Sequence, residues 1–210
     1  MNTIIDWDTQ VFLAINRLHT PFMDHFMDLY SEKWVWIPFY ASLFFVICMR
    51  IKDWKRILWT AIAIAILITL TDQTCAHLIR PFVERLRPAN LENPLHTMVH
   101  IVNGERGGRF GFPSCHSANS WGLTIFLMYL LRDRWMNTLM VIWTIIICYS
   151  RIYLGVHYPG DLLAATLVAL LWATVVYRIL RPHVLPVSPR DRWTAVPWTA
   201  FFITLIAMMA

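Results

Sequence analysis

Six long apolar segments occupy most of this chain and leave few folds open to it. They lie at about residues 34–49, 57–79, 115–131, 136–150, 160–177 and 194–210. The chain is 58% hydrophobic and only 15% charged, whereas soluble domains average roughly 45–50% and about 25%. Several segments hold only about 16 strongly apolar residues, against roughly 20 for a helix that crosses the hydrocarbon core. We therefore predict an all-α, polytopic membrane helical bundle with about six transmembrane helices.

The N-terminal residues differ from the rest, because their apolar side chains recur at helical spacing. The apolar positions are Ile4, Ile5, Trp7, Val11, Phe12, Ile15 and Leu18, with polar residues between them. This pattern is typical of an amphipathic helix that lies on a membrane surface. A second short helix of this kind is predicted over 22–30. The chain therefore divides into interfacial helices at 1–33 and a six-span domain at 34–210.

Positive charge is concentrated in three alternate loops. The segments 50–56, 132–134 and 178–192 together hold ten basic residues, among them Arg190. Short loops rich in Lys and Arg face the cytoplasm, so the intervening loops at 80–114 and 151–159 are predicted to lie together outside. The net charge of +5 fits this topology and anionic lipids better than nucleic acid, because the basic residues are scattered between apolar runs.

The sequence SRIYLGVHYPGD, at 150–161, brings together groups suited to phosphoryl chemistry. It contains Ser150, Arg151, His157 and Asp161. A histidine can attack phosphorus if its ring is neutral and one ring nitrogen is fixed by an acceptor, and Asp161 is the candidate acceptor. Arg151 offers a planar, permanently charged fork that matches phosphate oxygens. The segment predicts phosphoryl chemistry at a membrane surface.

A second group of basic residues lies upstream, in RPFVERLRP at 80–88. If 81–87 is helical, Arg80 and Arg87 project on nearly the same face. Two arginines on one face repel each other unless an anion lies between them, and Glu84 could neutralise them in part. The alternative interpretation is a basic helix beside the membrane that contacts lipid headgroups.

Polar residues also interrupt the ends of two apolar segments. The second segment closes on Thr71, Asp72, Gln73 and His77, and the third opens on Ser114, His116, Ser117, Asn119 and Ser120. Ionisable groups at this depth face a bundle interior or a wet cavity, so the two ends are predicted to line one cavity. Asp72 and His77 either line that cavity, orient Arg80, or form a buried polar pair between helices.

Within 113–116, Ser114 and His116 have two interpretations. Ser114 can cap a helix and also donate a hydrogen bond to an anion. His116 can donate a proton to a leaving alkoxide as a general acid. The alternative is a capping serine next to an interfacial histidine, with no catalytic role for either.

Together the clusters read R-x6-RP, PSxH and SR-x5-H-x3-D, and they resemble the type 2 phosphatidic acid phosphatase family. The pattern of that family is K-x6-RP, PSGH and SR-x5-H-x3-D. Its superfamily includes class A acid phosphatases and vanadium haloperoxidases. Two positions depart from the pattern: Arg80 replaces a lysine and Cys115 replaces a glycine.

The resemblance implies a role for each motif residue. His157 is implied as the nucleophile that forms a phosphohistidine, Asp161 as the residue that orients it, and His116 as the acid and later the base. Arg80, Arg87, Ser114 and Arg151 are implied to hold the phosphoryl oxygens. The resemblance also implies a metal-independent phosphatase, and no cofactor or metal site is predicted from the spacing of Asp, Glu and His.

By the same resemblance the chain is a membrane lipid phosphatase that cleaves a phosphomonoester or a diphosphate. Its candidate substrates are undecaprenyl pyrophosphate, lipid A phosphate, phosphatidylglycerol phosphate and phosphatidic acid. The short chain is similar to small bacterial members, which favours undecaprenyl pyrophosphate and lipid A phosphate. We expect a bacterial cytoplasmic membrane, and the loop charges place the site on its outer, periplasmic face. Two alternatives stay open: a lipid-phosphate binding or transport protein with a degraded site, and a phosphatase of water-soluble sugar phosphates. Membrane lipids are expected partners, and nothing in the sequence indicates an oligomeric state.

Overall fold

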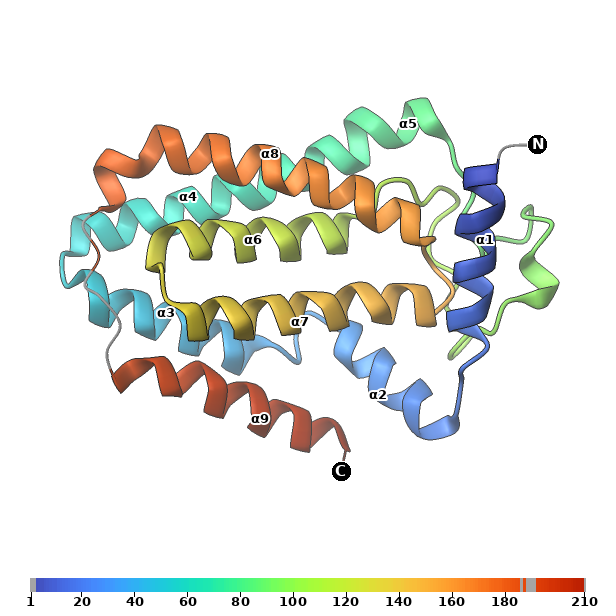
Figure 1. Ribbon diagram of the computed structural model, residues 1–210, viewed down its shortest axis with the longest axis horizontal. Helices are drawn as coiled ribbons and strands as arrows, with labels where there is room; N and C mark the ends of the chain where they lie inside the picture. Colours follow the sequence, from blue (N-terminus) through green and yellow to red (C-terminus); the bar gives the residue numbers. More distant parts are fainter. Residues whose placement is uncertain (1–2, 186, 188–191, 210) are drawn as a thin grey trace.

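The computed structural model describes residues 3–185, 187 and 192–209, and within these ranges every regular element is a helix (Figure 1). The α-helices are α1 (Thr3–Asn16), α2 (Pro21–Ser31), α3 (Ile37–Ile51), α4 (Trp54–Gln73), α5 (Arg80–Val83), α6 (Cys115–Leu131), α7 (Arg134–Tyr153), α8 (Pro159–Val184) and α9 (Ala195–Met209). A π-helical segment, Thr74–Ile79, joins α4 to α5, and short 3-10 turns occupy His96–Met98 and Arg192–Thr194.

The long helices run side by side along the main axis of the molecule, and α6 lies among them in contact with α4, α7 and α8 (Figure 1). The helix α3 packs against α4 and α9. A cluster of buried aromatic rings joins these layers, and Trp36 lies 6.0 Å from Trp143 and 5.8 Å from Phe201 between ring centroids. Aromatic pairs at this spacing contribute packing beyond their buried area.

Three helical segments are long and apolar enough to cross a membrane: Trp54–Val83, Arg134–Tyr153 and Pro159–Val184. The helices α3 and α9 are apolar but shorter, with 15 residues each, and α6 has 17. Each of the six predicted apolar runs overlaps one of these helices. Large apolar side chains on α8, such as Leu163 and Ile179, are more than half exposed, as expected of a surface that faces lipid. The prediction of an all-helical membrane bundle is confirmed.

Two similar turns close one end of the bundle. The helix α3 ends at Lys52, with φ 56°, and Asp53 then caps α4 by accepting a hydrogen bond from Lys55 N. The helix α6 ends at Arg132, with φ 49°, and Asp133 caps α7. A basic residue in the left-handed conformation followed by a capping aspartate thus reverses the chain twice.

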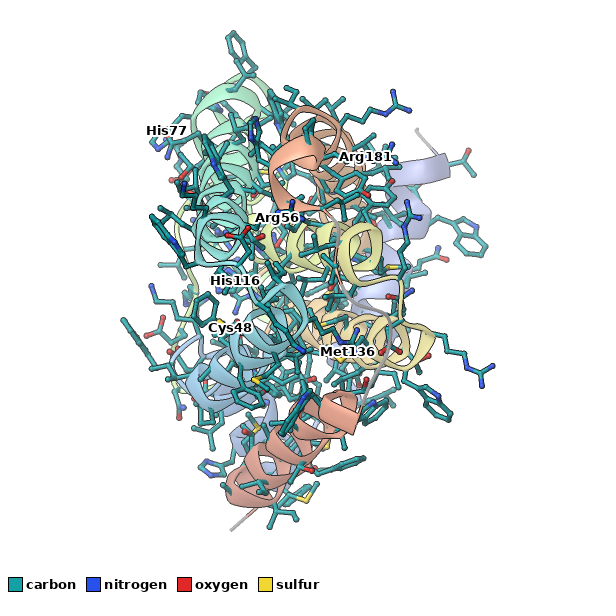
Figure 2. All side chains as sticks on the ribbon, turned by 90° about the vertical axis from the view of Figure 1, so that its left-hand side faces the viewer. Cys48, Arg56, His77, His116, Met136 and Arg181 are labelled. Carbon is teal, nitrogen blue, oxygen red and sulfur yellow. The ribbon has the colours of Figure 1, made fainter. Side chains whose placement is uncertain are left out.

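The same end carries the three basic segments of the sequence. Figure 2 looks onto this end, where Arg56 and Arg181 lie at the starts and ends of long helices. Arg190 lies outside the described residues. Buried within this end, Arg50 contacts Asp133 at 2.7 Å, and the Thr194 hydroxyl donates to the same carboxylate at 2.8 Å. The ion pair ties α3 to the turn between α6 and α7.

The two N-terminal helices lie at the opposite end, near the predicted ranges 4–18 and 22–30. In Figure 1, α1 crosses the ends of the long helices almost at right angles to them. Its buried side includes Phe12, whose ring lies 5.2 Å from that of Tyr158, while Trp7 is largely exposed. The side chain of Asn16 donates to the Tyr153 carbonyl at 2.8 Å, which holds the end of α1 against α7.

The condition that 81–87 forms one helix does not hold. The helix α5 ends at Val83, and Glu84 adopts a left-handed φ of 48° that turns the chain out of the helix. The next residues pair with the later loop instead, since Gly111 N donates to the Arg85 carbonyl at 2.9 Å. Arg80 and Arg87 therefore do not share a helical face. Glu84 is exposed and has no ion pair within the described residues, so it does not neutralise them.

Candidate active site

His157 lies in the loop between α7 and α8, and its side chain is only 2% exposed. The loop reverses at Gly155, where φ is 75° and an added Cβ would lie 2.7 Å from Val99 Cγ1. Only glycine tolerates both this backbone conformation and this close approach. The reversal lets His157 N donate to the Arg151 carbonyl at 3.2 Å, which fixes the histidine above the end of α7.

The two ring nitrogens of His157 have different partners. Its Nδ1 lies 3.3 Å from Asp161 Oδ2, and its Nε2 lies 3.1 Å from Arg87 Nη1. A guanidinium has only donors, so Nε2 must accept and the ring proton must sit on Nδ1, toward Asp161. Burial, together with the charges of Arg87, Arg151 and Arg80, holds the pKa of His157 well below its usual value. The ring is therefore neutral, with the lone pair on Nε2.

Three arginines converge on this histidine from separate parts of the chain. Arg80 Nη2 donates to the Pro113 carbonyl at 3.0 Å, Arg87 Nη1 donates to the Val156 carbonyl at 3.1 Å, and Arg151 Nη1 donates to Ser31 Oγ. The Nε atoms of all three are buried without a hydrogen-bond partner in the described part of the chain.

The same three arginines have no carboxylate within 4.0 Å among the described residues, and this leaves the cluster strongly positive. Burial and the charge of Arg80 lower the pKa of Arg87 to about 10. Buried donors without acceptors and buried charges without counter-charges are both costly. The cluster, hereafter the arginine cluster (Arg80, Arg87 and Arg151), is thus suited to an anion with several oxygens.

The second motif joins this cluster at the start of α6. Ser114 is buried, caps α6 by accepting from Ser117 N at 3.4 Å, and donates its own N–H to the Asp161 carbonyl at 3.2 Å. Cys115 begins the helix without a left-handed φ, so the position does not need the glycine of the family pattern. Its sulfur accepts a hydrogen bond from Arg80 Nη2 at 3.1 Å. The two residues that depart from the family pattern are therefore in direct contact.

His116 opens onto an apolar cavity of about 640 Å³ that runs between α3, α4, α6 and α7. Near His116 the cavity is lined by Lys33, Asp72 and Asn119, and further along it is lined by apolar side chains such as Leu43 and Ile64. The preceding residue, Cys115, lines the same cavity and accepts the hydrogen bond from Arg80 of the arginine cluster. His116 thus lies between the arginine cluster and the cavity.

Of the two residues with open roles, Asp72 lines the cavity and His77 does not. The amide of Asn119 donates to Asp72 Oδ1 at 3.5 Å, and its own Oδ1 accepts from the Thr71 hydroxyl at 2.7 Å. His77 is exposed on the outer side of the bundle (Figure 2). The two residues do not form a buried pair.

Several residues at the site were not identified by the sequence analysis. Ser31 and Lys33 come from α2 and the turn after it, and Arg85 contacts Asp161 at 2.9 Å. Gly111 packs against Asp161 and Arg87, since an added Cβ there would lie 3.3 Å from Asp161 Oδ2 and 3.0 Å from Arg87 Cγ. The only sequence feature that could have indicated a role for Arg85 was the excess of arginines in RLRP. Its partners are more than 70 residues away in the chain, so local spacing could not reveal them.

Comparison with known proteins identifies similar chains. The model of the PAP2 superfamily matches residues 57–185. A lipid A 4′-phosphatase of Bacteroides thetaiotaomicron is 50% identical over 163 residues, which cover 78% of this chain and 72% of that protein. A lipid A 4′-phosphatase of Porphyromonas gingivalis is 29% identical over 195 residues, with coverages of 92% and 78%. The crystal structure of a PAP2-type phosphatidylglycerolphosphate phosphatase from Bacillus subtilis superposes with a TM-score of 0.60 at 22% identity, over 87% of this chain and 88% of that one.

Proposed function

The chain belongs to the PAP2 superfamily, and on this premise we propose that it is an integral membrane phosphatase that hydrolyses the phosphate of a lipid. The observation that carries the proposal is the junction at Cys115 and His116, where the arginine cluster meets an apolar cavity. The arginine cluster accounts for a phosphoryl group, and the cavity of about 640 Å³ accounts for an apolar body attached to it. A water-soluble sugar phosphate would use only the first of these features.

In the proposed mechanism the phosphoryl oxygens bind the arginine cluster, and His157 Nε2 attacks phosphorus. The bond between phosphorus and the leaving oxygen breaks while His116 donates a proton to that oxygen. Asp161 accepts the Nδ1 proton in a hydrogen bond and stabilises the positive charge that develops on the ring. The fixed guanidinium groups stabilise the equatorial oxygens, which is the main requirement of phosphoryl transfer.

In the second step His116 acts as a base. It removes a proton from a water molecule, whose oxygen attacks the phosphorus of the phosphohistidine. The phosphorus–nitrogen bond then breaks, inorganic phosphate leaves, and His157 returns to its neutral form with the lone pair on Nε2. The arginines supply the positive charge that metal ions supply in other phosphatases, so the scheme contains no metal.

For the substrate we infer a lipid A phosphate, with undecaprenyl pyrophosphate as the second candidate. The similarity to lipid A 4′-phosphatases at 50% and 29% identity supports this order. We further infer that the site faces the periplasm of a bacterial cytoplasmic membrane. The basic turns lie at the end of the bundle opposite to the motifs, which supports this orientation by the charge rule for cytoplasmic loops.

The proposal is tested by incubating the purified protein with a panel of phosphates. The panel contains lipid A, undecaprenyl pyrophosphate, phosphatidylglycerol phosphate, phosphatidic acid and glucose 6-phosphate, and released inorganic phosphate is measured. We expect release from lipid A, loss of release in His157→Ala, and unchanged release in the matched control His77→Ala. Release from glucose 6-phosphate alone would favour the sugar-phosphate alternative. Lipid binding without any release would favour a binding or transport protein.

The orientation is tested separately by labelling single cysteines placed in the 92–109 loop of the full chain. We expect a membrane-impermeant thiol reagent to label them from the periplasmic side. Labelling from the cytoplasmic side alone would reverse the inferred orientation, whatever the substrate.

A further inference from the structure

Arg85 lies beside the active site but outside the arginine cluster, and both ends of its guanidinium are occupied. Its Nη1 donates to Asp161 Oδ1 at 2.9 Å, and its Nη2 donates to Asp8 Oδ2 at 2.6 Å. The guanidinium carbon lies 3.9 Å from the ring centroid of Tyr158, which covers one face of it. Paired carboxylates and an aromatic face hold an arginine in one orientation.

The two oxygens of the Asp161 carboxylate have different partners, and Arg85 binds one of them. Oδ2 faces His157 Nδ1 at 3.3 Å and accepts from Tyr158 N at 3.0 Å, whereas Oδ1 is bound by Arg85. A carboxylate held at both oxygens cannot rotate about its last bond without losing a charge-assisted hydrogen bond. The direction in which Asp161 presents Oδ2 to the histidine is therefore set in part by Arg85.

Asp8 connects this arrangement to the N-terminal helix α1. Its Oδ1 accepts from Gly160 N at 2.7 Å, and its Oδ2 binds Arg85. A Cβ added to Gly160 would lie 2.8 Å from Asp8 Oδ2, so a larger residue would displace the aspartate. The side chain of Asp8 is only 11% exposed. One carboxylate from the interfacial helix thus anchors both Arg85 and the first turn of α8.

We propose that Arg85 is a positioning residue for His157 and that Asp8 anchors it, in the order Asp8–Arg85–Asp161–His157. The inference rests on the proposed function, because it assigns these residues to the same phosphoryl-transfer site. It makes the interfacial helix α1 a part of the active site, although that helix lies outside the residues matched by the family model. Arg85 acts through Asp161 and not on the substrate.

The experiment compares Arg85→Gln, Arg85→Lys and Asp8→Asn with the wild-type chain in detergent. The matched control is Arg109→Gln, which breaks an ion pair with Glu92 in the same outer loop, where both side chains are more than half exposed. The rate of phosphate release is measured against lipid A concentration, so that kcat and KM are obtained separately. Circular dichroism and the unfolding temperature establish that each variant is folded.

We expect Arg85→Gln to lower kcat about 10²-fold while KM stays within about twofold, because misplacement of the nucleophile affects the chemical step and leaves binding intact. Arg85→Lys should recover part of the loss, since a lysine can bind one carboxylate but cannot bridge both. Asp8→Asn should lower kcat by about tenfold or less, and should cost little more when Arg85→Gln is already present. Arg109→Gln should match the wild type.

A chemical rescue separates positioning from general stability. Adding methylguanidinium to Arg85→Ala should restore part of kcat, because the small cation can occupy the vacated space between the two carboxylates. It should not restore His157→Ala, which lacks the nucleophile. No rescue of a folded Arg85→Ala, or a kcat of Arg85→Gln within twofold of the wild type, would overturn the role of Arg85. A change confined to KM would assign Arg85 to substrate binding instead.

Orthovanadate provides a readout that does not depend on the lipid, because it mimics a five-coordinate phosphoryl group. We expect Arg85→Gln to bind orthovanadate more weakly than the wild type, and Arg109→Gln to bind it equally. If the wild-type chain hydrolyses no lipid, the proposed function fails, and the vanadate comparison still decides the positioning role. Equal vanadate affinity in Arg85→Gln and the wild type would overturn that role by itself.

Discussion

The bundle has a basic end, which carries the turns at 52–53 and 132–133, and a motif end, which carries the three sequence motifs. Arginine nitrogens are buried at both ends, but the two ends differ in whether a carboxylate neutralises them. At the basic end, Arg50 and Asp133 have side chains with 0% exposure and contact each other at 2.7 Å, so the cation has its counter-ion within the fold. At the motif end, the arginine cluster has no carboxylate within 4.0 Å in the described part of the chain. One end uses its arginine to hold helices together, and we infer that the other holds its arginines ready for an anion that the protein does not supply.

The largest expected effect lies at the motif end and comes from His157, the proposed nucleophile. His157→Ala should lower phosphate release by at least about 10³-fold, because the covalent route is lost and only binding and electrostatic stabilisation remain. The unfolding temperature should change little by comparison. A variant that retains more than a tenth of the wild-type rate would assign the attack to another group.

Substitution of an arginine in the arginine cluster should lower activity without lowering stability. Arg87→Gln should lower kcat/KM about 10²- to 10³-fold, as expected for loss of a group that stabilises transition-state charge. It should leave the unfolding temperature equal or higher, because it relieves repulsion from Arg80. Phosphate release and thermal unfolding in detergent are measured on the same preparation, with Arg87→Lys as control. A marked loss of stability would show that Arg87 is a structural ion like Arg50.

The ion pair at the basic end should behave in the reverse manner. Asp133→Asn should lower the free energy of unfolding by about 3 kcal/mol, because it leaves a buried guanidinium without this carboxylate. Activity per folded molecule should stay close to that of the wild type, since the pair lies at the end of α3 and the start of α7, opposite to the end that carries α1 (Figure 1). The double variant Arg50→Met with Asp133→Asn should regain most of the stability, and failure to do so would contradict an ionic origin of the loss.

The pH dependence of the motif end depends on the same charges. Burial, Arg87, Arg151 and Arg80 hold the pKa of His157 well below its usual value, while Asp161 faces its Nδ1. A protonated ring cannot attack phosphorus, so activity is lost as the pH falls through that pKa. Arg87→Gln removes one positive charge and raises this pKa, so the acid limb of kcat/KM should move to higher pH. If the acid limb of kcat/KM stays at the same pH in Arg87→Gln, a group other than His157 determines it.

The smallest effect is expected from an exposed arginine at the basic end. Arg56 lies 3.5 Å from Asp53, and both side chains are about a third to a half exposed. Arg56→Gln should change the free energy of unfolding by less than about 0.5 kcal/mol and leave activity unchanged. A larger loss would show that burial is not what separates Arg50 from the other basic residues of this end.

The parts of the fold that could be predicted are those with local signals. The run 115–131 matches α6 residue for residue, because Ser114 caps one end and a basic residue in the left-handed conformation ends the other. His157 and Asp161 could be paired from their spacing alone, since four residues at a helix start bring the two side chains together. Short-range geometry of this kind can be predicted from the spacing of neighbouring residues alone.

The parts that could not be predicted depend on distant contacts. Residues 81–87 do not form one helix, because Glu84, which has no local bias toward the left-handed conformation, turns the chain and the following segment pairs with residues near 110. Arg85 looks like any other basic residue of an outer loop until Asp8 and Asp161 are placed beside it. The sequence predicted a cavity between two polar helix ends but left the role of Asp72 open, because its place in the wall depends on the positions of four helices.

The charge of the arginine cluster is present before any substrate arrives, and this determines how a reaction cycle ends. In the proposed mechanism the cluster holds phosphoryl oxygens during transfer, and inorganic phosphate presents similar oxygens, so we expect the product to compete with the next lipid for the site. Sulfate and other tetrahedral oxyanions compete in the same way. We therefore expect turnover to depend on how fast the anion exchanges with the water outside, and lipid hydrolysis to slow as free phosphate accumulates around the enzyme.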